Sequence, residues 1–245
     1  MKSIIRKINA FIKRRFSSFF YKHHFDNICT DNNLDVIKEK RFLKAILQAE
    51  KDCGISINIP LRVHQAIFFS GVKAKQNMSM VEIGTGKGYT FSAILNYHKE
   101  KLKNNKIFLI DSFLPTKPDF KTGEQKIDGI RNKAYASNVK EVEKSFSKFQ
   151  NVSIIQGIVP KILDKNLLKK IKKISFLHID LNHHIAEIQA LEILLPILDK
   201  NAIILLDDFA NPGRKIQYQA HKDFFNKHGL EILTLPSGQG AVLLS

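Results

Sequence analysis

The chain has 245 residues, 44% of them hydrophobic, so it is long enough for one α/β domain with an additional segment. No apolar run approaches the length of about 18 residues that spans a membrane, and two cysteines, Cys29 and Cys53, exclude a disulfide framework and predict a reducing cytoplasm. The net charge of +16 suits nucleic acid or an anionic membrane, although a coding bias that scatters lysine over every surface helix explains it equally.

The first 25 residues combine positive charge with an apolar stripe. No acidic residue precedes Asp26, and apolar residues recur at spacings near three and four among the basic ones. This pattern is typical of a basic amphipathic helix, which can lie on an anionic membrane surface. The alternatives are a helix packed on its own domain or on a second subunit, and a targeting peptide. The basic residues are Lys2, Arg6, Lys7, Lys13, Arg14, Arg15 and Lys22.

Residues 1 to about 54 are predicted to be helical, ending at Gly54, and residues 60–75 form another expected helix. We therefore divide the chain into a basic helical extension, 1–55, and a main domain, 56–245. From residue 79 short apolar runs alternate with helical patterns. Strands are predicted at 79–83, 106–111, 152–156, 175–180, 202–208, 231–235 and 241–245, and helices begin near Tyr89, Ser137, Val159 and Ile185.

This alternation predicts a doubly wound parallel sheet of five strands. The last two strands are separated by only five residues, 236–240, which is too short for a parallel crossover and indicates an antiparallel hairpin. Five parallel strands followed by such a pair are the Rossmann-like architecture of class I methyltransferases. Ligands of these sheets bind at the carboxyl ends of the strands.

The first strand leads into three glycines at alternate positions, Gly84, Gly86 and Gly88, two residues after Glu82. Tyr89 stands where the dinucleotide fingerprint needs glycine, and Val81 stands where a phosphate-binding P-loop needs one. The remaining pattern is an acid followed by glycines that allow close approach of a ligand. A purely structural turn is the alternative.

Asp111 ends the second strand, 23 residues beyond Gly88. An acid at this place can accept hydrogen bonds from both hydroxyls of a ribose, and a helix cap is the alternative. The glycine turn and Asp111 together predict a cofactor that contains ribose.

Three further acids follow later strands: Asp180, Asp207 and Asp208. Neighbouring strand ends bring them together, and unpaired buried charges cost several kcal/mol each. A divalent cation would resolve this repulsion, and an all-oxygen set suits magnesium, calcium or manganese. The alternative has Asp208 capping the helix after Pro212 and Asp207 bonding to backbone amides.

Histidines surround Asp180. His183 and His184 follow it at the mouth of the same cleft, and a histidine there can accept a proton from a substrate hydroxyl. His178 precedes Asp180 within the strand and is expected to face a helix. We take His183 as a candidate catalytic base.

The runs "IDSFLP", "VSIIQG", "FLHIDLNHH", "AIILLDDF", "PGRKIQYQAHKDFF" and "LPSGQG" resemble the macrocin O-methyltransferase family in order and spacing, from about residue 56 to the C-terminus. The resemblance implies S-adenosylmethionine as methyl donor and a divalent cation, usually magnesium, that positions a sugar hydroxyl. It implies that Glu82, Gly84 and Gly86 line the methionine side, that Asp111 binds ribose, and that the three later acids bind the metal. It also makes Asp180 a second candidate catalytic base. The expected cofactor site also includes Thr85, Gly88, Ser112 and Gly157.

The chain departs from the family at several positions. Asn182 replaces a second acid, His183 and His184 stand where an aromatic is common, Ile158 replaces a frequent acid near the adenine, and "DSFLP" is a shortened loop. The loop 112–136 and the N-terminal helices are candidates for a lid and an acceptor pocket.

The expected reaction is O-methylation of a sugar or other polyhydroxy acceptor. An RNA methyltransferase, a non-catalytic partner protein with the same fold and a hydroxylase-like relative are the alternatives. Nucleic acid is not the first choice of partner, because the N/D-P-P-aromatic signature of amino-methylating enzymes is absent. The acceptor and a homo-oligomeric state are left open.

Overall fold

The computed structural model describes residues 23–26, 28–74, 77–114, 116–118, 125–127 and 138–245, and a seven-stranded sheet lies at its centre. The strand order is β10-β11-β9-β8-β3-β4-β7. Five strands are parallel: β3 (Ser79–Ile83), β4 (Lys106–Asp111), β7 (Val152–Gln156), β8 (Ile174–Ile179) and β9 (Leu198–Leu206). The antiparallel pair β10 (Leu233–Thr234) and β11 (Gly240–Leu243) extends the sheet beside β9, as the sequence predicts.

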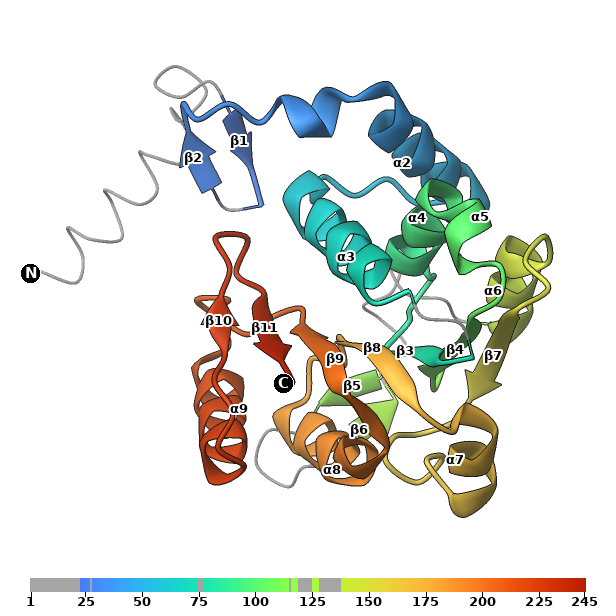
Figure 1. The fold of residues 1–245 in the computed structure, drawn as a ribbon, viewed down its shortest axis with the longest axis vertical. Helices are drawn as coiled ribbons and strands as arrows, with labels where there is room; N and C mark the ends of the chain where they lie inside the picture. The colour runs from blue at the N-terminus through green and yellow to red at the C-terminus, as the bar shows by residue number, and fades with distance from the viewer. Residues whose placement is uncertain (1–22, 27, 75–76, 115, 119–124, 128–137) are drawn as a thin grey trace, which may run out of the picture.

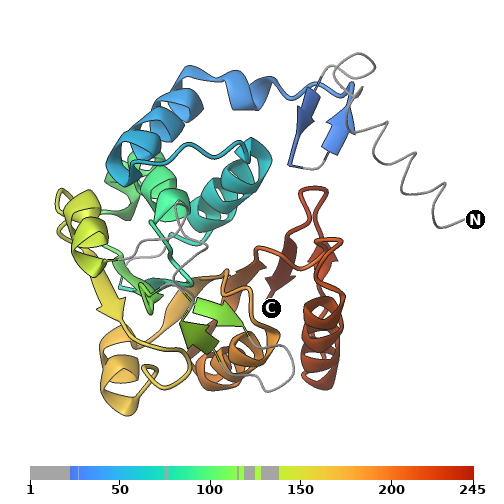
Figure 2. The same cartoon turned by 180° about the vertical axis from the view of Figure 1, so that it is seen from behind.

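Helices cover both faces of the sheet, as Figures 1 and 2 show from opposite sides. One face carries α2 (Lys40–Cys53), α3 (Pro60–Val72), α4 (Tyr89–Tyr97), α5 (Lys99–Leu102) and α6 (Val139–Phe146). The other face carries α7 (Lys165–Ile171), α8 (His184–Leu194) and α9 (Lys215–Lys227). Two short 3-10 helices, η1 (Asp35–Lys38) and η2 (Leu195–Ile197), precede α2 and β9.

The central strand β3 explains why both faces are covered. Met80 belongs to the apolar cluster under α2, α3 and α4, whereas Val81 and Ile83 belong to the cluster under α7, α8 and α9. Alternate side chains of a strand point to opposite faces, so this continuous apolar run requires helices on both sides. Because helices cover both faces of β3, polar side chains meet at its carboxyl end.

The N-terminal prediction is wrong within residues 23–30. A helix was expected there, but β1 (His23–Phe25) and β2 (Ile28–Thr30) form an antiparallel hairpin. Asp26 begins the two-residue turn at φ 50°, a conformation that Asp and Asn tolerate in hairpins, so the "DN" dipeptide was the overlooked signal. The basic segment 1–22 lies outside the described residues.

Two other elements differ from expectation. The helix predicted near Val159 begins six residues later, at Lys165, because the Asp164 side chain accepts the Leu167 backbone N–H and caps it. Within the predicted lid loop, β5 (Thr116–Pro118) pairs with β6 (Gln125–Ile127), and the neighbouring residues 119–124 and 128–137 lie outside the described part of the chain.

In the part of the chain that the structure describes, no helix combines the length and the apolar character needed to cross a bilayer. Cys29 and Cys53 are both free thiols, as their number predicts. Burial raises the pKa of the Cys53 thiol to about 12, so this cysteine stays protonated.

Candidate functional site

The glycine turn after β3 is shaped by positive φ angles. Gly84, Gly86 and Gly88 have φ of 88°, 54° and 81°. A Cβ on Gly84 would lie 2.1 Å from the backbone oxygen of Asp180, and one on Gly88 would lie 2.4 Å from the Phe146 ring. Glycine is therefore required where the turn approaches the end of β8, and the turn and Asp180 form one site.

Asp111 lies over this turn from the end of β4. Its Oδ2 accepts the Gly86 backbone N–H at 2.8 Å, and its Oδ1 accepts the Phe113 backbone N–H at 2.9 Å and the Ser112 hydroxyl at 3.3 Å. The Gly157 backbone N–H donates to the Asp111 carbonyl at 2.8 Å. The structure thus brings together Asp111, Ser112, Gly157 and the glycine turn, with the carboxylate only partly exposed.

Glu82 and His178 form a buried pair under the strand ends. Glu82 Oε1 lies 2.9 Å from His178 Nδ1, and His178 Nε2 lies 3.6 Å from Asp207 Oδ1, an ion-pair distance rather than a hydrogen bond. Burial lowers the pKa of His178, but Asp207 and Glu82 outweigh it and raise the pKa to about 10. His178 is therefore an imidazolium between two acids. It shares the strand face of Phe176, which packs in the apolar cluster under α2, α3 and α4, so its side chain lies on the face that these helices cover.

Glu82 itself lies below the turn rather than in it. Its side chain is 2% exposed, and burial raises its pKa above the ordinary range despite the contact with His178. Thr85, also buried, follows it in the turn. The Glu82 carboxylate contacts the His178 side chain, so Glu82 holds His178 in place within the buried part of the site.

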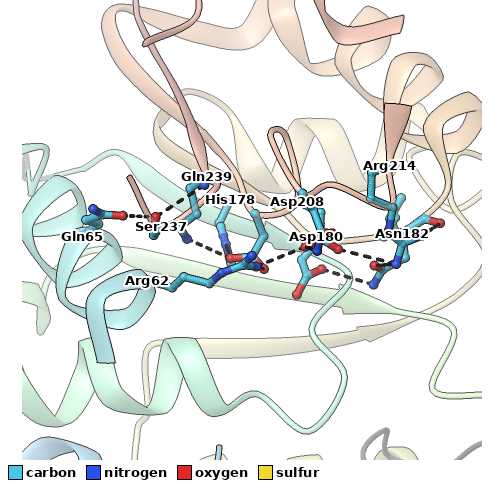
Figure 3. A network of polar contacts seen from close by, with 12 residues as sticks. Arg62, Gln65, His178, Asp180, Asn182, Asp208, Arg214, Ser237 and Gln239 are labelled. Carbon is cyan, nitrogen blue, oxygen red and sulfur yellow. Dashed lines mark hydrogen bonds and ion pairs between the residues drawn. The ribbon is translucent and has the colours of Figure 1, made fainter. Parts of the chain in front are cut away.

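Asp207 and Asp208 end β9 and are joined by one guanidinium. Arg62 Nη1, from α3, lies 2.6 Å from Asp207 Oδ2 and 3.1 Å from Asp208 Oδ1 (Figure 3). Burial alone would lower the pKa of Arg62, but the two carboxylates raise it above its ordinary value. Conversely, burial raises the pKa of Asp207, while His178 and Arg62 outweigh this effect and lower it to about 2.

Further side chains contact the two carboxylates. Gln239 Nε2 donates to Asp207 Oδ1 at 2.8 Å, and Asn211 Nδ2 donates to Asp208 Oδ1 at 3.2 Å. Arg214 Nη2 lies 3.6 Å from Asp208 Oδ2. The predicted bonds from Asp207 to backbone amides are replaced by side-chain contacts. Asp208 does not cap α9 either, since Arg214 occupies the cap position without a side-chain cap bond.

These contacts do not fit a bound dication. Among the described residues, no group of three His, Cys, Asp or Glu side chains is arranged to hold a metal ion. The predicted ligands Asp180, Asp207 and Asp208 do share one neighbourhood, because Asp207 and Asp208 both act on the charge of Asp180. The gap between Asp207 and Asp208, however, is occupied by Arg62.

Asp180 differs from the other two acids because, among the described residues, no cation pairs with it closely. Asn182 Nδ2 donates a long hydrogen bond, 3.3 Å, to Asp180 Oδ1. Burial and then the charges of Asp207 and Asp208 raise the pKa of Asp180 well above its ordinary value. A carboxylate of this kind holds protons more strongly than an exposed aspartate, which suits proton abstraction near neutral pH.

His183 caps a helix. Its Nδ1 accepts the Ala186 backbone N–H at 3.2 Å, and the side chain is 1% exposed. His184 stacks beside it at 5.8 Å between ring centroids and is more exposed. The two adjacent histidines therefore have different environments, and the buried one is tied to α8.

A cavity of about 370 Å³ is lined by residues 212–217 and His184, and the Arg214 side chain lies 3.6 Å from Asp208 Oδ2. Arg214 connects the cavity to the acids, since it also donates to the backbone and side-chain oxygens of Asn182 (Figure 3). The sequence analysis does not predict four of the site residues: Arg62, Asn182, Arg214 and Gln239. For Arg214 a signal existed, namely its place between Pro212 and the helix that follows Asp208.

The chain is similar to methyltransferases by two comparisons. A methyltransferase-domain family matches residues 81–209, and no curated protein matches the chain. The O-methyltransferase NovP has a TM-score of 0.59 at 18% identity over 75% of this chain and 78% of its own. The calicheamicin methyltransferase CalS11 has a TM-score of 0.60 at 13% identity over 84% of this chain and 93% of its own.

A third solved structure, the SAH-bound methyltransferase PaMTH1 of Podospora anserina, covers nearly the whole chain. Its TM-score is 0.54 at 16% identity, over 99% of this chain and 96% of its own. At such identities the three structures establish the fold, and they confirm the class I architecture predicted from the strand pattern.

Proposed function

The chain belongs to this methyltransferase-domain family, and from that premise we propose that it transfers a methyl group from S-adenosylmethionine to a hydroxyl of a sugar or other polyhydroxy acceptor. One observation carries the proposal. The Gly84 turn packs directly on the Asp180 backbone, so the expected donor site and the strongest candidate base are adjacent.

The donor site fits a ribose-bearing ligand. Asp111 is held at the carboxyl end of β4 by backbone N–H groups on either side, and its oxygens retain acceptor capacity for ribose hydroxyls. Gly84, Gly86 and Gly88 keep side chains out of the turn above which the donor would lie, with Thr85 between them. Ser112 and Gly157 would border the adenosine, and Glu82 would act from below by orienting His178.

The donor, when bound, supplies an electrophilic methyl group on a sulfonium. An alcohol is a weak nucleophile, and the chain offers Asp180 to accept its proton, because the raised pKa of Asp180 makes it a stronger base than an ordinary carboxylate. Of the two candidates we favour Asp180 over His183, whose Nδ1 caps α8. Alignment of the reactants can contribute about 7–11 kcal/mol, more than a single proton transfer.

The acceptor would bind in the cavity lined by residues 212–217 and His184. Its lining includes two basic side chains, Arg214 and Lys215, beside the apolar Ile216. This mixture suits a polyhydroxy ligand with an apolar face, which pockets of this size commonly hold. The names of NovP and of the calicheamicin methyltransferase support a small-molecule acceptor, and the finer resemblance to the macrocin O-methyltransferases supports a sugar.

Magnesium is not part of the proposed reaction steps. The prediction that Asp180, Asp207 and Asp208 bind a dication rested on their need for positive charge, and Arg62 and His178 supply positive charge here. Four further expectations stay predictions. They are the peripheral membrane role of residues 1–25, the division into domains 1–55 and 56–245, a cytoplasmic location and a homo-oligomeric state.

Donor binding tests the proposal. We expect calorimetry to show that wild type binds S-adenosylmethionine and that Asp111→Ala weakens binding by about tenfold or more, since a ribose hydrogen bond to a charged group contributes about 1.5–3 kcal/mol. The matched control is Asp164→Ala, which also removes a carboxylate bonded to a backbone N–H, but at the start of α7. No binding by wild type would favour a non-catalytic partner protein, and equal affinities in wild type and Asp111→Ala would remove the ribose assignment.

A further inference from the structure

We propose that Arg62 is the permanent cation of the Asp207–Asp208 pair, and that this chain binds no divalent metal between these carboxylates. The inference concerns the same site as the proposed methyl transfer and rests on it for the identity of the reaction. The metal-binding measurement below does not depend on that reaction. Arg62 is a positioning residue here, because it contacts the acids that surround Asp180.

The space between the two carboxylates is already filled. Nη1 of Arg62 lies 2.6 Å from one oxygen of Asp207 and 3.1 Å from one oxygen of Asp208. A magnesium ion bound to the same two oxygens would need distances of about 2.0–2.1 Å to each. The ion and the guanidinium nitrogen would therefore occupy the same gap, so one excludes the other.

The outer oxygens offer no alternative site. Asp207 Oδ1 accepts from Gln239 at 2.8 Å and lies 3.6 Å from the imidazolium of His178. Asp208 Oδ2 faces Arg214 at 3.6 Å. A metal approaching from this side would meet a second cation at each carboxylate. Like charges at such distances repel each other.

Arg62 is also held where it is. The side chain is 8% exposed, and it extends from the first turn of α3, which begins at Pro60. The backbone N–H of the preceding residue, Leu61, donates to Asp26 Oδ2 at 2.7 Å, which fixes this turn against the N-terminal hairpin. On the other side, a Cβ at Gly238 would lie 3.5 Å from Arg62 Nη2. The guanidinium therefore projects from an anchored helical turn and lies beside the β10–β11 loop.

The charges in the site are balanced without a metal. Arg62 and His178 face Asp207, and Arg62 and Arg214 face Asp208. Buried carboxylates are stable only when they are paired in this way. A dication would add an excess of positive charge to a site that already holds these cations.

The test titrates purified full-length protein with Mn²⁺, whose free concentration is followed by electron paramagnetic resonance. We expect wild type to show no saturable site that depends on Asp207 and Asp208. Arg62→Met keeps a long apolar side chain and removes the charge, and it should bind Mn²⁺ at least about tenfold more tightly than wild type. The gained site should be lost when Asp207→Asn and Asp208→Asn are added.

Two control variants distinguish the role of the Arg62 charge from a general effect of replacing an arginine. Arg41→Met removes an arginine whose guanidinium donates to the Tyr97 carbonyl and lies 4.1 Å from the centroid of the Tyr97 ring, and this variant should bind Mn²⁺ as wild type does. Arg62→Lys keeps a charge at the site and should still exclude Mn²⁺, which tests the inference if Arg62→Met does not fold. Stoichiometric Mn²⁺ binding by wild type, abolished by Asp207→Asn, would overturn the inference.

Failure of the Arg62 inference can be distinguished from failure of the proposed methyl transfer. S-adenosylmethionine binding is measured by calorimetry on the same samples in the presence of a chelator. Donor binding together with a wild-type Mn²⁺ site would overturn only the role of Arg62. Absence of donor binding together with absence of a Mn²⁺ site would overturn only the methyl transfer.

Discussion

Asp180 is one of three neighbouring carboxylates, and in the described part of the chain it is the one that pairs closely with no cation. Arg62 pairs with Asp207 and Asp208, whereas Asp180 receives a 3.3 Å bond from Asn182. The cluster therefore contains one acid whose pKa is lowered, Asp207, and one whose pKa is raised by burial and by its neighbours, Asp180. Pairs of acids with diverging pKa values are the usual basis for dividing catalytic roles.

We expect Asp180→Asn to lower kcat by about 10²- to 10⁴-fold, the usual contribution of a general base. Donor affinity should change little, because Asp180 approaches the glycine turn through its backbone. Steady-state rates and donor calorimetry on the same variant measure both quantities. Asp164→Asn, at the start of α7, is the control for loss of an aspartate.

The pH profile distinguishes a base from a merely structural acid. Abstraction needs the ionised form, so the wild-type rate should rise with pH through the raised pKa of Asp180 and level off above it. Asp180→Asn should lose this rising limb. If the variant keeps both the limb and the rate, Asp180 is not the base.

At the residue scale, the sequence identifies acids better than their partners. Asp180 and Asp207 could be placed together because the ends of neighbouring parallel strands meet at one edge of the sheet. Arg62 precedes Asp207 by 145 positions, on a helix whose rotation about its axis no local pattern specifies. For His178, strand alternation gives the face of the sheet but not its two acidic partners, Glu82 and Asp207.

At the element scale, the glycine turn couples β3 to β8. Gly84 and Gly54 both have positive φ, 88° and 61°, but only Gly84 is crowded, since a Cβ on Gly54 would meet nothing within 4 Å. The two positions therefore separate the cost of a left-handed backbone from the cost of close approach.

Gly54→Ala should lower the free energy of unfolding by about 1–2 kcal/mol, the cost of a left-handed residue with a side chain. Gly84→Ala should lose clearly more, and donor binding as well, because its Cβ would lie 2.1 Å from the Asp180 carbonyl oxygen. Urea denaturation and calorimetry measure the two effects. Equal losses of stability in both variants would contradict the close packing of the turn on β8.

Elements with a strong period were predictable, and those shaped by a single residue were not. The apolar runs of β3, β4 and β7 have the predicted bounds, because helices on both faces require continuous apolar strands. The start of α7 depends on one cap, Asp164, and the β1–β2 hairpin depends on the turn at Asp26. Such local bonds compete with helix periodicity and outweigh it only in the folded context.

At the scale of the whole molecule, the N-terminal hairpin is joined to the main sheet through α3. Asp26 is 6% exposed, and its Oδ2 accepts the Leu61 backbone N–H at 2.7 Å, one residue before Arg62. Figure 1 shows the hairpin beside the end of α3 and the β10–β11 loop. Helix α2, part of the predicted extension, shares an apolar cluster with β3 and α4, so the segment before residue 55 contributes to the core.

This connection should make stability depend on pH. Burial raises the pKa of Asp26 from 3.8 to about 6, although the Leu61 hydrogen bond opposes this. Between these two values the folded chain holds a proton that the unfolded chain has lost. The contribution of Asp26 to the free energy of unfolding therefore falls as pH rises through this window and is constant above it.

Asp26→Asn keeps an acceptor for Leu61 and removes the titration. Relative to wild type, the variant should gain up to about 2 kcal/mol between pH 4 and pH 7, a value reduced from the full linkage by solvent screening. Urea denaturation over this range measures the difference in the free energy of unfolding. The control variant is Asp35→Asn, which removes an exposed carboxylate that pairs with Lys38. Parallel pH curves for wild type and Asp26→Asn would show that the hairpin does not bury this carboxyl group against α3, and Arg62 would then lack its support from the N-terminal side.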